Sequence, residues 1–219
     1  MRLPEGSTPH PIFVSPKGNS PSAGAEAARA PKCAAADGAQ RNETISAALN
    51  TEAQFAIDSG DLDKAEVVLA EAEKTQTLAL ERHALDAAKT LALRGGIALT
   101  RQRFGEAVER FAAAAEILPA GHDDERFAYL NAEADAFYRQ GNECRSREAF
   151  ASAISRYRHI ALVRSRGAFP QDWAMIQMRL GAALQTLSEC GGGTDLLEDA
   201  AAAYRSALQE FTRASAPQL

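Results

Sequence analysis

Cysteine is scarce in this chain: its 219 residues include only three, at positions 33, 144 and 190. An odd number of cysteines without a CxxC pair indicates neither a disulfide framework nor a zinc ribbon. We therefore expect reduced thiols with structural roles.

Residues that would mark a metal site or a catalytic centre are also few. The four histidines lie far apart, and none belongs to an HExxH pattern or to a Cys/His pair at ligand spacing. The run His122 to Glu125, which reads HDDE, is better explained as a helix start, because acidic side chains complement the positive end of the helix dipole. No nucleophile is paired with a base at a recognisable spacing. The sequence predicts no catalytic residue, no metal site and no cofactor, and hence a protein that is not an enzyme.

Glycines 191 to 193 could suggest a phosphate-binding loop. No strand is expected before them, however, and no Gly-Lys-Ser/Thr follows them. We expect a flexible link between two helices, with Thr194 or Asp195 capping the second helix.

Long apolar runs and an excess of basic residues are both missing. The run Ile12 to Val14 is too short for a signal peptide, and no stretch of about 18 apolar residues could cross a bilayer. Lys and Arg number 24 against 29 Asp and Glu, whereas general nucleic-acid binders are normally basic. We expect a cytoplasmic protein that binds neither nucleic acid nor membranes.

The first part of the chain differs in composition from the rest. Six of the nine prolines lie before residue 32, interleaved with Gly, Ser and Ala and without periodic apolar residues. Such a stretch cannot offset the entropy of ordering. The sequence predicts a disordered leader over residues 1–42.

Residues 43–219 are predicted to be all-α. Apolar residues recur at helical spacing, and no alternating β-branched run is long enough for a strand. Turn signals near residues 59–61, 119–121, 141–142, 167–170 and 191–193 divide this part into helices.

Four segments repeat one pattern of alanine and larger apolar residues at steps of four and three. The pattern occupies Ala65-Leu69-Ala72, Ala107-Phe111-Ala114, Ala153-Tyr157-Ile160 and Ala200-Tyr204-Ala207. Upstream of each stands a small residue: Ala53 and Gly95 precede their alanine by 12 residues, and Ala134 and Gly181 precede theirs by 19. The difference of seven is about two helical turns, which keeps every stripe facing the same way. We expect the small residues where two helices cross most closely, and the aromatic residues in wider gaps further along.

These residues resemble the tetratricopeptide repeat, whose two helices carry Leu, Gly or Ala, then Ala, Phe or Tyr, Ala and Pro. The best match is the second segment, with Leu91, Gly95, Ala107, Phe111, Ala114 and Pro119. The third and fourth segments are similar to a longer variant of this repeat. The resemblance implies an α-solenoid of about four antiparallel helix pairs in a right-handed superhelix, with units of about 43–80, 84–119, 123–168 and 171–217.

The resemblance also implies a function: a non-catalytic scaffold or adaptor that binds a peptide or protein on its concave face. Transferred by position, the candidate peptide-binding residues are Asn50, Gln54, Asp58, Lys89, Asn131, Asp135, Tyr138, Arg139, Met178 and Gln185. An alternative is a regulatory or sensor segment of a larger signalling or effector protein, separated from its output domain.

Charge is unevenly distributed. Residues 43–81 hold nine acids against two lysines, and residues 139–166 hold seven arginines against two glutamates. Solvated helix faces explain this distribution, and an acidic peptide that docks on the arginine-rich part is the sharper alternative. The last helix is expected to leave an apolar face bare, which predicts self-association or a covering partner.

Overall fold

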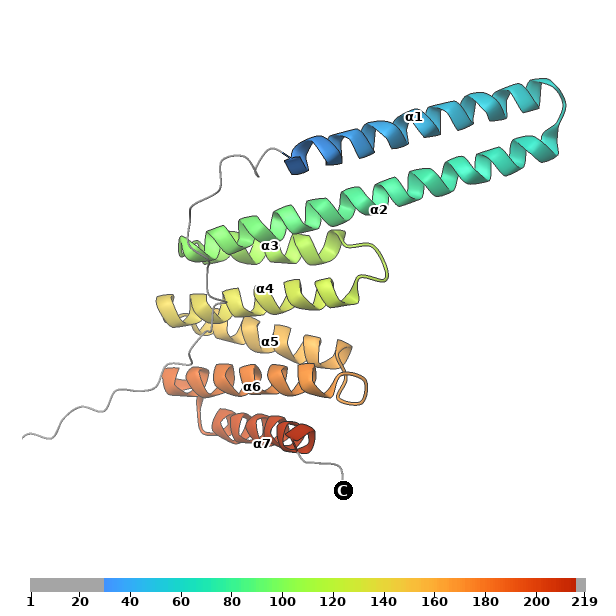
Figure 1. Ribbon diagram of the computed structural model, residues 1–219. Coiled ribbons are helices and arrows are strands. Elements are labelled where there is room, and N and C mark those ends of the chain that lie inside the picture. Colours follow the sequence, from blue (N-terminus) through green and yellow to red (C-terminus); the bar gives the residue numbers. More distant parts are fainter. Residues whose placement is uncertain (1–29, 216–219) are drawn as a thin grey trace, which may run out of the picture. The chain divides into compact units, whose positions relative to one another are not determined.

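The computed structural model describes the backbone of residues 30–215 and the side chains of residues 41–191 and 193–213. This part of the chain is all-α, with seven α-helices, one π-helical turn and no strand (Figure 1). The elements are α1 (Ala30–Asp58), α2 (Leu62–Thr100), α3 (Phe104–Ile117), α4 (Asp123–Cys144), α5 (Arg147–Val163), α6 (Pro170–Leu187), η1 (Ser188–Gly192) and α7 (Asp195–Ser215). The chain divides into two compact units, residues 1–69 and 70–219.

The described part of the first unit is a helical hairpin of α1 and the start of α2. Gly60, with φ of 82°, makes the turn, and Asp61 caps α2 by accepting a hydrogen bond from the Lys64 backbone N–H at 3.2 Å. Lys64 also pairs with Glu52 of α1 at 3.1 Å. The side chains buried in this hairpin are small: Ala53, Ala56 and Ala65.

The expected leader over residues 1–42 needs correction at its C-terminal end. Residues 30–42 belong to α1, and residues 1–29 lie outside the described part of the chain. Alanine, the strongest helix former, is the most frequent residue of this segment. Pro31 stands in the first turn of α1, where a backbone N–H would have no helical acceptor, so the missing N–H of proline breaks no hydrogen bond. The prediction based on proline content therefore placed the start of the helical region too late in the sequence.

The expected division between the units 43–80 and 84–119 also differs from the structure. α2 is one helix of 39 residues that passes through residues 81–83 without a break. The segment Glu81 to His83 contains no glycine or proline, so nothing in it stops a helix. Repeat length alone suggested the boundary.

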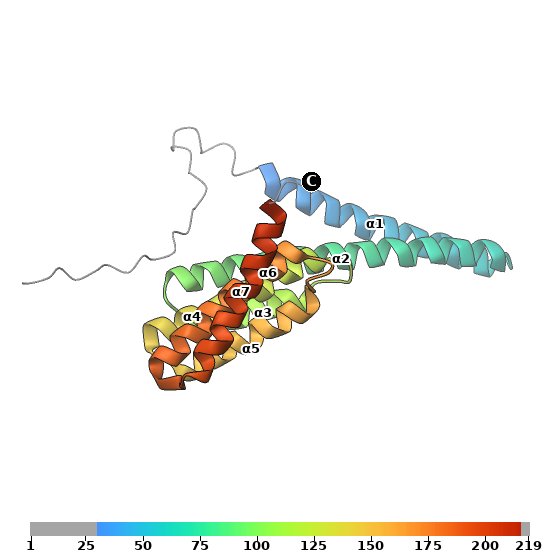
Figure 2. The same cartoon turned by 90° about the horizontal axis from the view of Figure 1, so that it is seen from below.

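In the second unit, successive helices lie next to one another in chain order. α3 contacts α4, α4 contacts α5, α5 contacts α6, and α6 contacts α7. Figures 1 and 2 show α7 at the end of this series.

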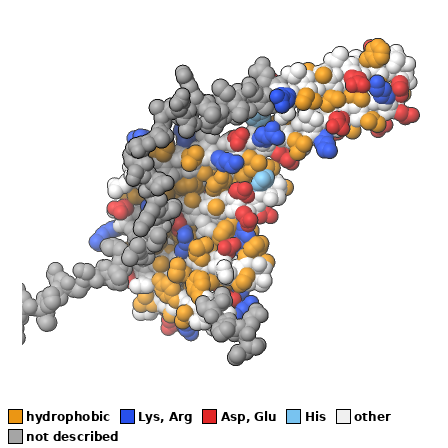
Figure 3. Space-filling model, in the orientation of Figure 1, with side chains coloured by type: hydrophobic (Ala, Val, Ile, Leu, Met, Phe, Trp, Pro, Cys, Tyr) orange, Lys and Arg blue, Asp and Glu red, His pale blue; other side chains and the backbone are white. Residues whose placement is uncertain are grey.

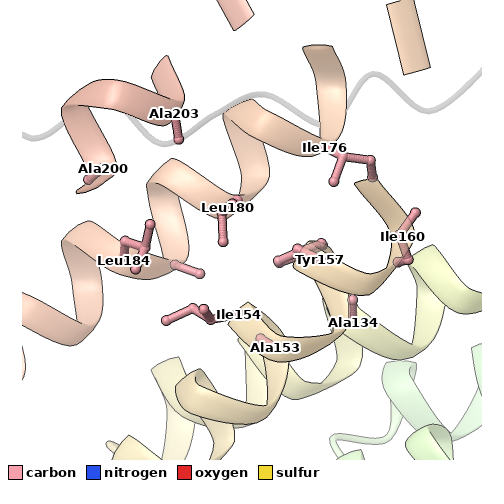
Figure 4. Packing of buried hydrophobic residues seen from close by; sticks show 11 residues of the cluster. Ala134, Ala153, Ile154, Tyr157, Ile160, Ile176, Leu180, Leu184, Ala200 and Ala203 are labelled. Atoms are coloured by element: carbon pink, nitrogen blue, oxygen red, sulfur yellow. The ribbon is translucent and has the colours of Figure 1, made fainter. Parts of the chain in front are cut away.

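The alanine pattern marks the buried side of these helices. Ala65, Ala107, Ala153 and Ala200 are all buried on helices. In the largest apolar cluster, Tyr157 lies in the middle, between Ala134 and Leu180 (Figure 4). Apolar burial of this kind is the main favourable contribution to folding.

Two of the small residues lie directly against the aromatic residue of their own segment. A methyl group added to Gly95 would meet the Phe111 ring at 3.0 Å, and one added to Gly181 would meet the Tyr204 ring at 2.9 Å. At both positions a neighbouring helix fills the space that a side chain would need, which agrees with the choice of glycine there. The prediction that the aromatic residues lie further along is wrong for Phe111 and Tyr204, because their rings occupy the space that the missing side chains leave.

A third close contact of this kind was missed. Gly141 of α4 faces the ring of Phe150, which a Cβ would approach to 2.7 Å. Gly141 stands seven residues after Ala134 and therefore on the same side of the helix. The position of Gly141 inside a helical segment could have indicated this contact, since glycine in a helix lowers stability by about 0.5–1 kcal/mol relative to alanine.

Specific side chains fix the helix ends in the second unit. Ser146 accepts a hydrogen bond from the Ala149 backbone N–H at 3.2 Å and so caps α5. Arg126 of α4 donates to the carbonyl oxygens of Leu118 and Pro119 just beyond α3, at 2.7 and 3.1 Å. These carbonyls would otherwise lack a helical partner.

The glycine-rich segment after α6 bends the chain between α6 and α7, where the sequence predicts a link. The turn η1 follows α6 directly, but Cys190 and Gly191 within it depart from helical φ and ψ values. The Ser188 hydroxyl donates to the Gly193 carbonyl oxygen at 2.7 Å, and Gly191 and Gly193 both have φ of 89°. Glycine suits these positions because such φ values are unfavourable for other residues.

Candidate functional site

An apolar groove lies in the second unit, along one side of α2. Its volume is about 660 Å³, and it is lined by Lys89, Ala92, Leu93, Gly96, Ile97, Thr100, Phe111 and Tyr129. The α2 residues follow one another at alternating steps of three and one, so they share one helix face. Leu93 and Ile97 are 71% and 53% exposed, which makes them available to a ligand.

The groove is almost entirely apolar, with polar groups at few points. Lys89 is its charged residue, and the Thr100 hydroxyl donates to the Gly96 carbonyl oxygen at 3.0 Å. Burial, together with the nearby Glu125 carboxylate, raises the pKa of the Tyr129 phenol. A ligand that fits would present apolar side chains and one anionic group.

Figure 3 shows the side-chain types on one face of the molecule. Hydrophobic side chains are spread over the helices of the second unit and are interspersed with charged ones.

Of the ten residues predicted to bind a peptide, Lys89 lines this groove. Arg139, Met178 and Gln185 are exposed elsewhere in the second unit, on α4 and α6. Asn131 is buried, and its side-chain oxygen has no hydrogen-bond partner within the described structure. A buried side chain cannot contact a ligand on the surface, so this assignment of Asn131 does not fit the structure.

Asp135 and Tyr138 contribute to contacts between helices. The Asp135 carboxylate accepts hydrogen bonds from the Tyr157 hydroxyl at 2.5 Å and from the Arg179 guanidinium, thereby joining α4, α5 and α6. Burial raises the pKa of Tyr157, and the Asp135 carboxylate raises it further. The Tyr138 hydroxyl lies 3.4 Å from the Thr186 hydroxyl of α6, and its ring meets the Phe150 ring edge-on.

The remaining three predicted residues belong to the first unit. Asn50, Gln54 and Asp58 are exposed on α1, and the Gln54 side-chain amide donates to the Asp58 carboxylate at 2.9 Å. Their four-residue spacing places them on one helix face.

The groove residues Leu93, Ile97 and Tyr129 were not predicted. Lys89, Leu93 and Ile97 follow one another at steps of four, which identifies a common helix face. The sequence could not show that this face stays open, because exposure depends on which neighbouring helices cover it.

Most of the arginine-rich segment 139–166 is engaged within the protein. Four of its seven arginines pair with carboxylates: Arg156 with Glu133, Arg158 with Asp199, Arg164 with Asp124 and Asp172, and Arg166 with Glu210. Within the described part of the chain, Arg139, Arg145 and Arg147 have no carboxylate at ion-pair distance. An acidic ligand would therefore find three available arginines rather than seven.

Arg164 shows how completely an arginine can be used to hold helices together. It is buried and donates to the Asp123 carbonyl oxygen at 3.0 Å. Its guanidinium stacks on the rings of Phe127 and Phe169, at 4.7 and 4.1 Å from their centroids. It thus connects the start of α4, the end of α5 and the start of α6.

The acidic run at 122–125 opens α4, as its sequence predicts, since α4 begins at Asp123. Asp123 pairs with Arg126 at 3.0 Å. Among the side chains that the structure describes, no group of three histidine, cysteine or acidic residues is arranged to hold a metal ion. Nor is any helix of residues 30–215 long and apolar enough to span a bilayer.

A second, smaller cavity lies between α5, α6 and α7. It has a volume of about 310 Å³ and is lined by Ala151, Ile154, Ser155, Arg158, Leu184, Leu187 and Leu196. Arg158 at its edge pairs with Asp199 at 3.4 Å, so the one charged group of this cavity already has a partner.

Comparison with known proteins gave no match: no family model, no curated protein and no solved structure is similar to this chain.

Proposed function

We propose that the protein is a tetratricopeptide-like solenoid that acts as a protein–protein interaction scaffold. Two observations support the solenoid: successive helices of the second unit contact one another in chain order, and the Gly95–Phe111 contact recurs as Gly181–Tyr204. Repeating units of this kind bury their apolar stripes by covering one another.

The binding surface in this proposal is the groove along α2. The observation that carries it is the combination of highly exposed Leu93 and Ile97 with an open apolar volume of about 660 Å³. A helical or extended peptide with two apolar side chains would bury them there. An acidic residue of the peptide would lie near Lys89.

Selection of peptides from a displayed random library against the full chain tests this function. The selected peptides are expected to contain paired apolar residues and an acidic residue. Titration calorimetry should then show that Ile97→Glu weakens binding by about tenfold or more, because it places a charge in an apolar site.

Leu162→Glu is the matched control, since Leu162 is also exposed but lies on α5 outside the groove. Lys89→Glu should weaken acidic peptides and spare neutral ones. Selected peptides that bind Ile97→Glu and the unmodified chain equally well would show that the groove is not the binding surface.

A further inference from the structure

α7 carries two parallel apolar stripes. The inner one is buried or half-buried and consists of Leu196, Ala200, Ala203 and Ala207. The outer stripe consists of Leu197, Ala201, Tyr204 and Leu208, and its two leucines are 45% and 61% exposed. Steps of four, three and four along it are the spacing at which two helices pack lengthwise.

One residue of the outer stripe, Tyr204, is held in place by contacts with α6. The Tyr204 ring rests on Gly181 of α6, and the Tyr204 hydroxyl donates to the Gln185 side-chain oxygen at 3.3 Å. A helix that lay along the stripe would therefore meet a fixed surface rather than a mobile side chain.

Two charged side chains beside the outer stripe have no ion-pair partner. Asp199 pairs with Arg158, and Glu210 pairs with Arg166 and Arg213. Glu198 and Arg205 form no ion pair with the side chains described for residues 41–191 and 193–213, and both are exposed. They stand seven residues apart, on the same edge of the stripe.

We propose that the outer stripe is a self-association surface, on which α7 of a second copy packs in the antiparallel direction. In one register, Leu197 faces Leu208 of the second copy, and Ala201 faces Tyr204 of the second copy. Twofold symmetry repeats both contacts, so the four stripe residues of each copy form four layers of side chains between the two helices. The small Ala201 leaves room for the large Tyr204 ring.

Charge complementarity identifies the occupant as another copy of this chain. In the same register, Glu198 of each copy lies opposite Arg205 of the other, giving two symmetric ion pairs. A partner with charge of one sign would satisfy only one of these two side chains. The chain thus matches itself in both apolar spacing and charge.

Sedimentation analysis of the full chain over a range of concentrations tests the surface. A dimer is expected, and Leu208→Glu should raise its dissociation constant by about tenfold or more, because the charge would be buried in the interface. Leu162→Glu on α5 and Ile97→Glu in the groove should leave the dimer unchanged. A chain that remains monomeric at every concentration, or a dimer that tolerates Leu208→Glu, would overturn the proposal.

Charge reversal tests the register without altering apolar residues. Glu198→Arg and Arg205→Glu should each weaken self-association, since each places like charges opposite one another. An equimolar mixture of the two variants should form a heterodimer more readily than either variant forms a homodimer, because both positions then hold opposite charges: one ion pair in its original sense and the other reversed. Circular dichroism confirms that each variant keeps its helix content. If the mixture showed no preference for the heterodimer, the antiparallel register would be wrong.

Discussion

The N-terminal hairpin and the helices of the second unit use the same alanine spacing but place different side chains beside it. In the hairpin, Ala53 and Ala65 are buried, whereas Phe55 and Val67 are 72% and 70% exposed. In the second unit, Phe111 and Tyr157 stand at the middle position of the pattern and are buried. Leu69 occupies the corresponding position of the first segment and is exposed.

This difference teaches that the alanine pattern alone does not produce a core. Hydrophobic stabilisation grows with the apolar area removed from water, and alanine contributes little area. The second unit gains its area from rings that rest on glycine, and it adds ion pairs in which one side chain is buried, such as that of Arg164 with Asp124. The hairpin should therefore be the less stable of the two regions.

The strongest test of this comparison replaces one phenylalanine in each region. Phe111→Ala should lower the free energy of unfolding by about 3–5 kcal/mol, because it empties a buried site against Gly95. Phe55→Ala should change it by less than about 0.5 kcal/mol, as expected for an exposed side chain. Urea denaturation measures both, and a loss below about 1 kcal/mol for Phe111→Ala would refute its role in the core.

Two glycine substitutions test whether close contact between a helix backbone and an aromatic ring matters for stability. Gly141→Ala should cost about 1–3 kcal/mol, since its methyl group would overlap the buried Phe150 ring. Gly96→Ala meets nothing within 4 Å and should stabilise α2 by about 0.5–1 kcal/mol. Thermal unfolding of the two variants should shift in opposite directions, and shifts of equal sign would contradict the contact.

The two regions can also be compared through one helix cap in each, because both caps have a hydrogen bond of 3.2 Å. Ser146→Ala removes a cap in the second unit and should lower the free energy of the main unfolding transition by about 1 kcal/mol. Asp61→Ala removes the corresponding cap of the hairpin, whose hydrogen bond has the same length, and should mainly speed amide hydrogen exchange in residues 43–69. If Asp61→Ala lowered the main transition as much as Ser146→Ala does, the two regions would unfold together.

The smallest effect concerns pH and a buried carboxylate of the second unit. Burial raises the pKa of Glu133 above its usual 4.5, and the Arg156 guanidinium at 2.6 Å offsets only part of this. The folded state then binds the Glu133 proton more tightly than the unfolded state does. Stability from this group is therefore present below pH 4.5 and is lost as pH rises through the folded pKa.

Glu133→Gln removes this titration while keeping the shape of the side chain. The stability of the variant relative to the unmodified protein should rise between pH 4.5 and neutral pH. Urea midpoints of both proteins across that range measure the difference. A difference independent of pH would show that Glu133 keeps its ordinary pKa.

Much of the helical structure could be predicted from local sequence signals. The acidic run before Arg126 predicted the start of α4, and alanine at steps of four and three predicted the buried faces. Long-range pairing could not be predicted in this way. Asp135 looked like a surface residue by position, yet it binds Tyr157 and Arg179 from two other helices.

The amino-acid sequence by itself determined the helical class and the buried side of most helices, because both depend on spacing along a single helix. It also indicated the close contacts at Gly95 and Gly181, because both glycines stand at the small-residue position of the repeated pattern. Only the tertiary structure decided which arginines are available and which faces stay open. Those properties depend on which helices lie against one another, and side chains far apart in the sequence supply the partners.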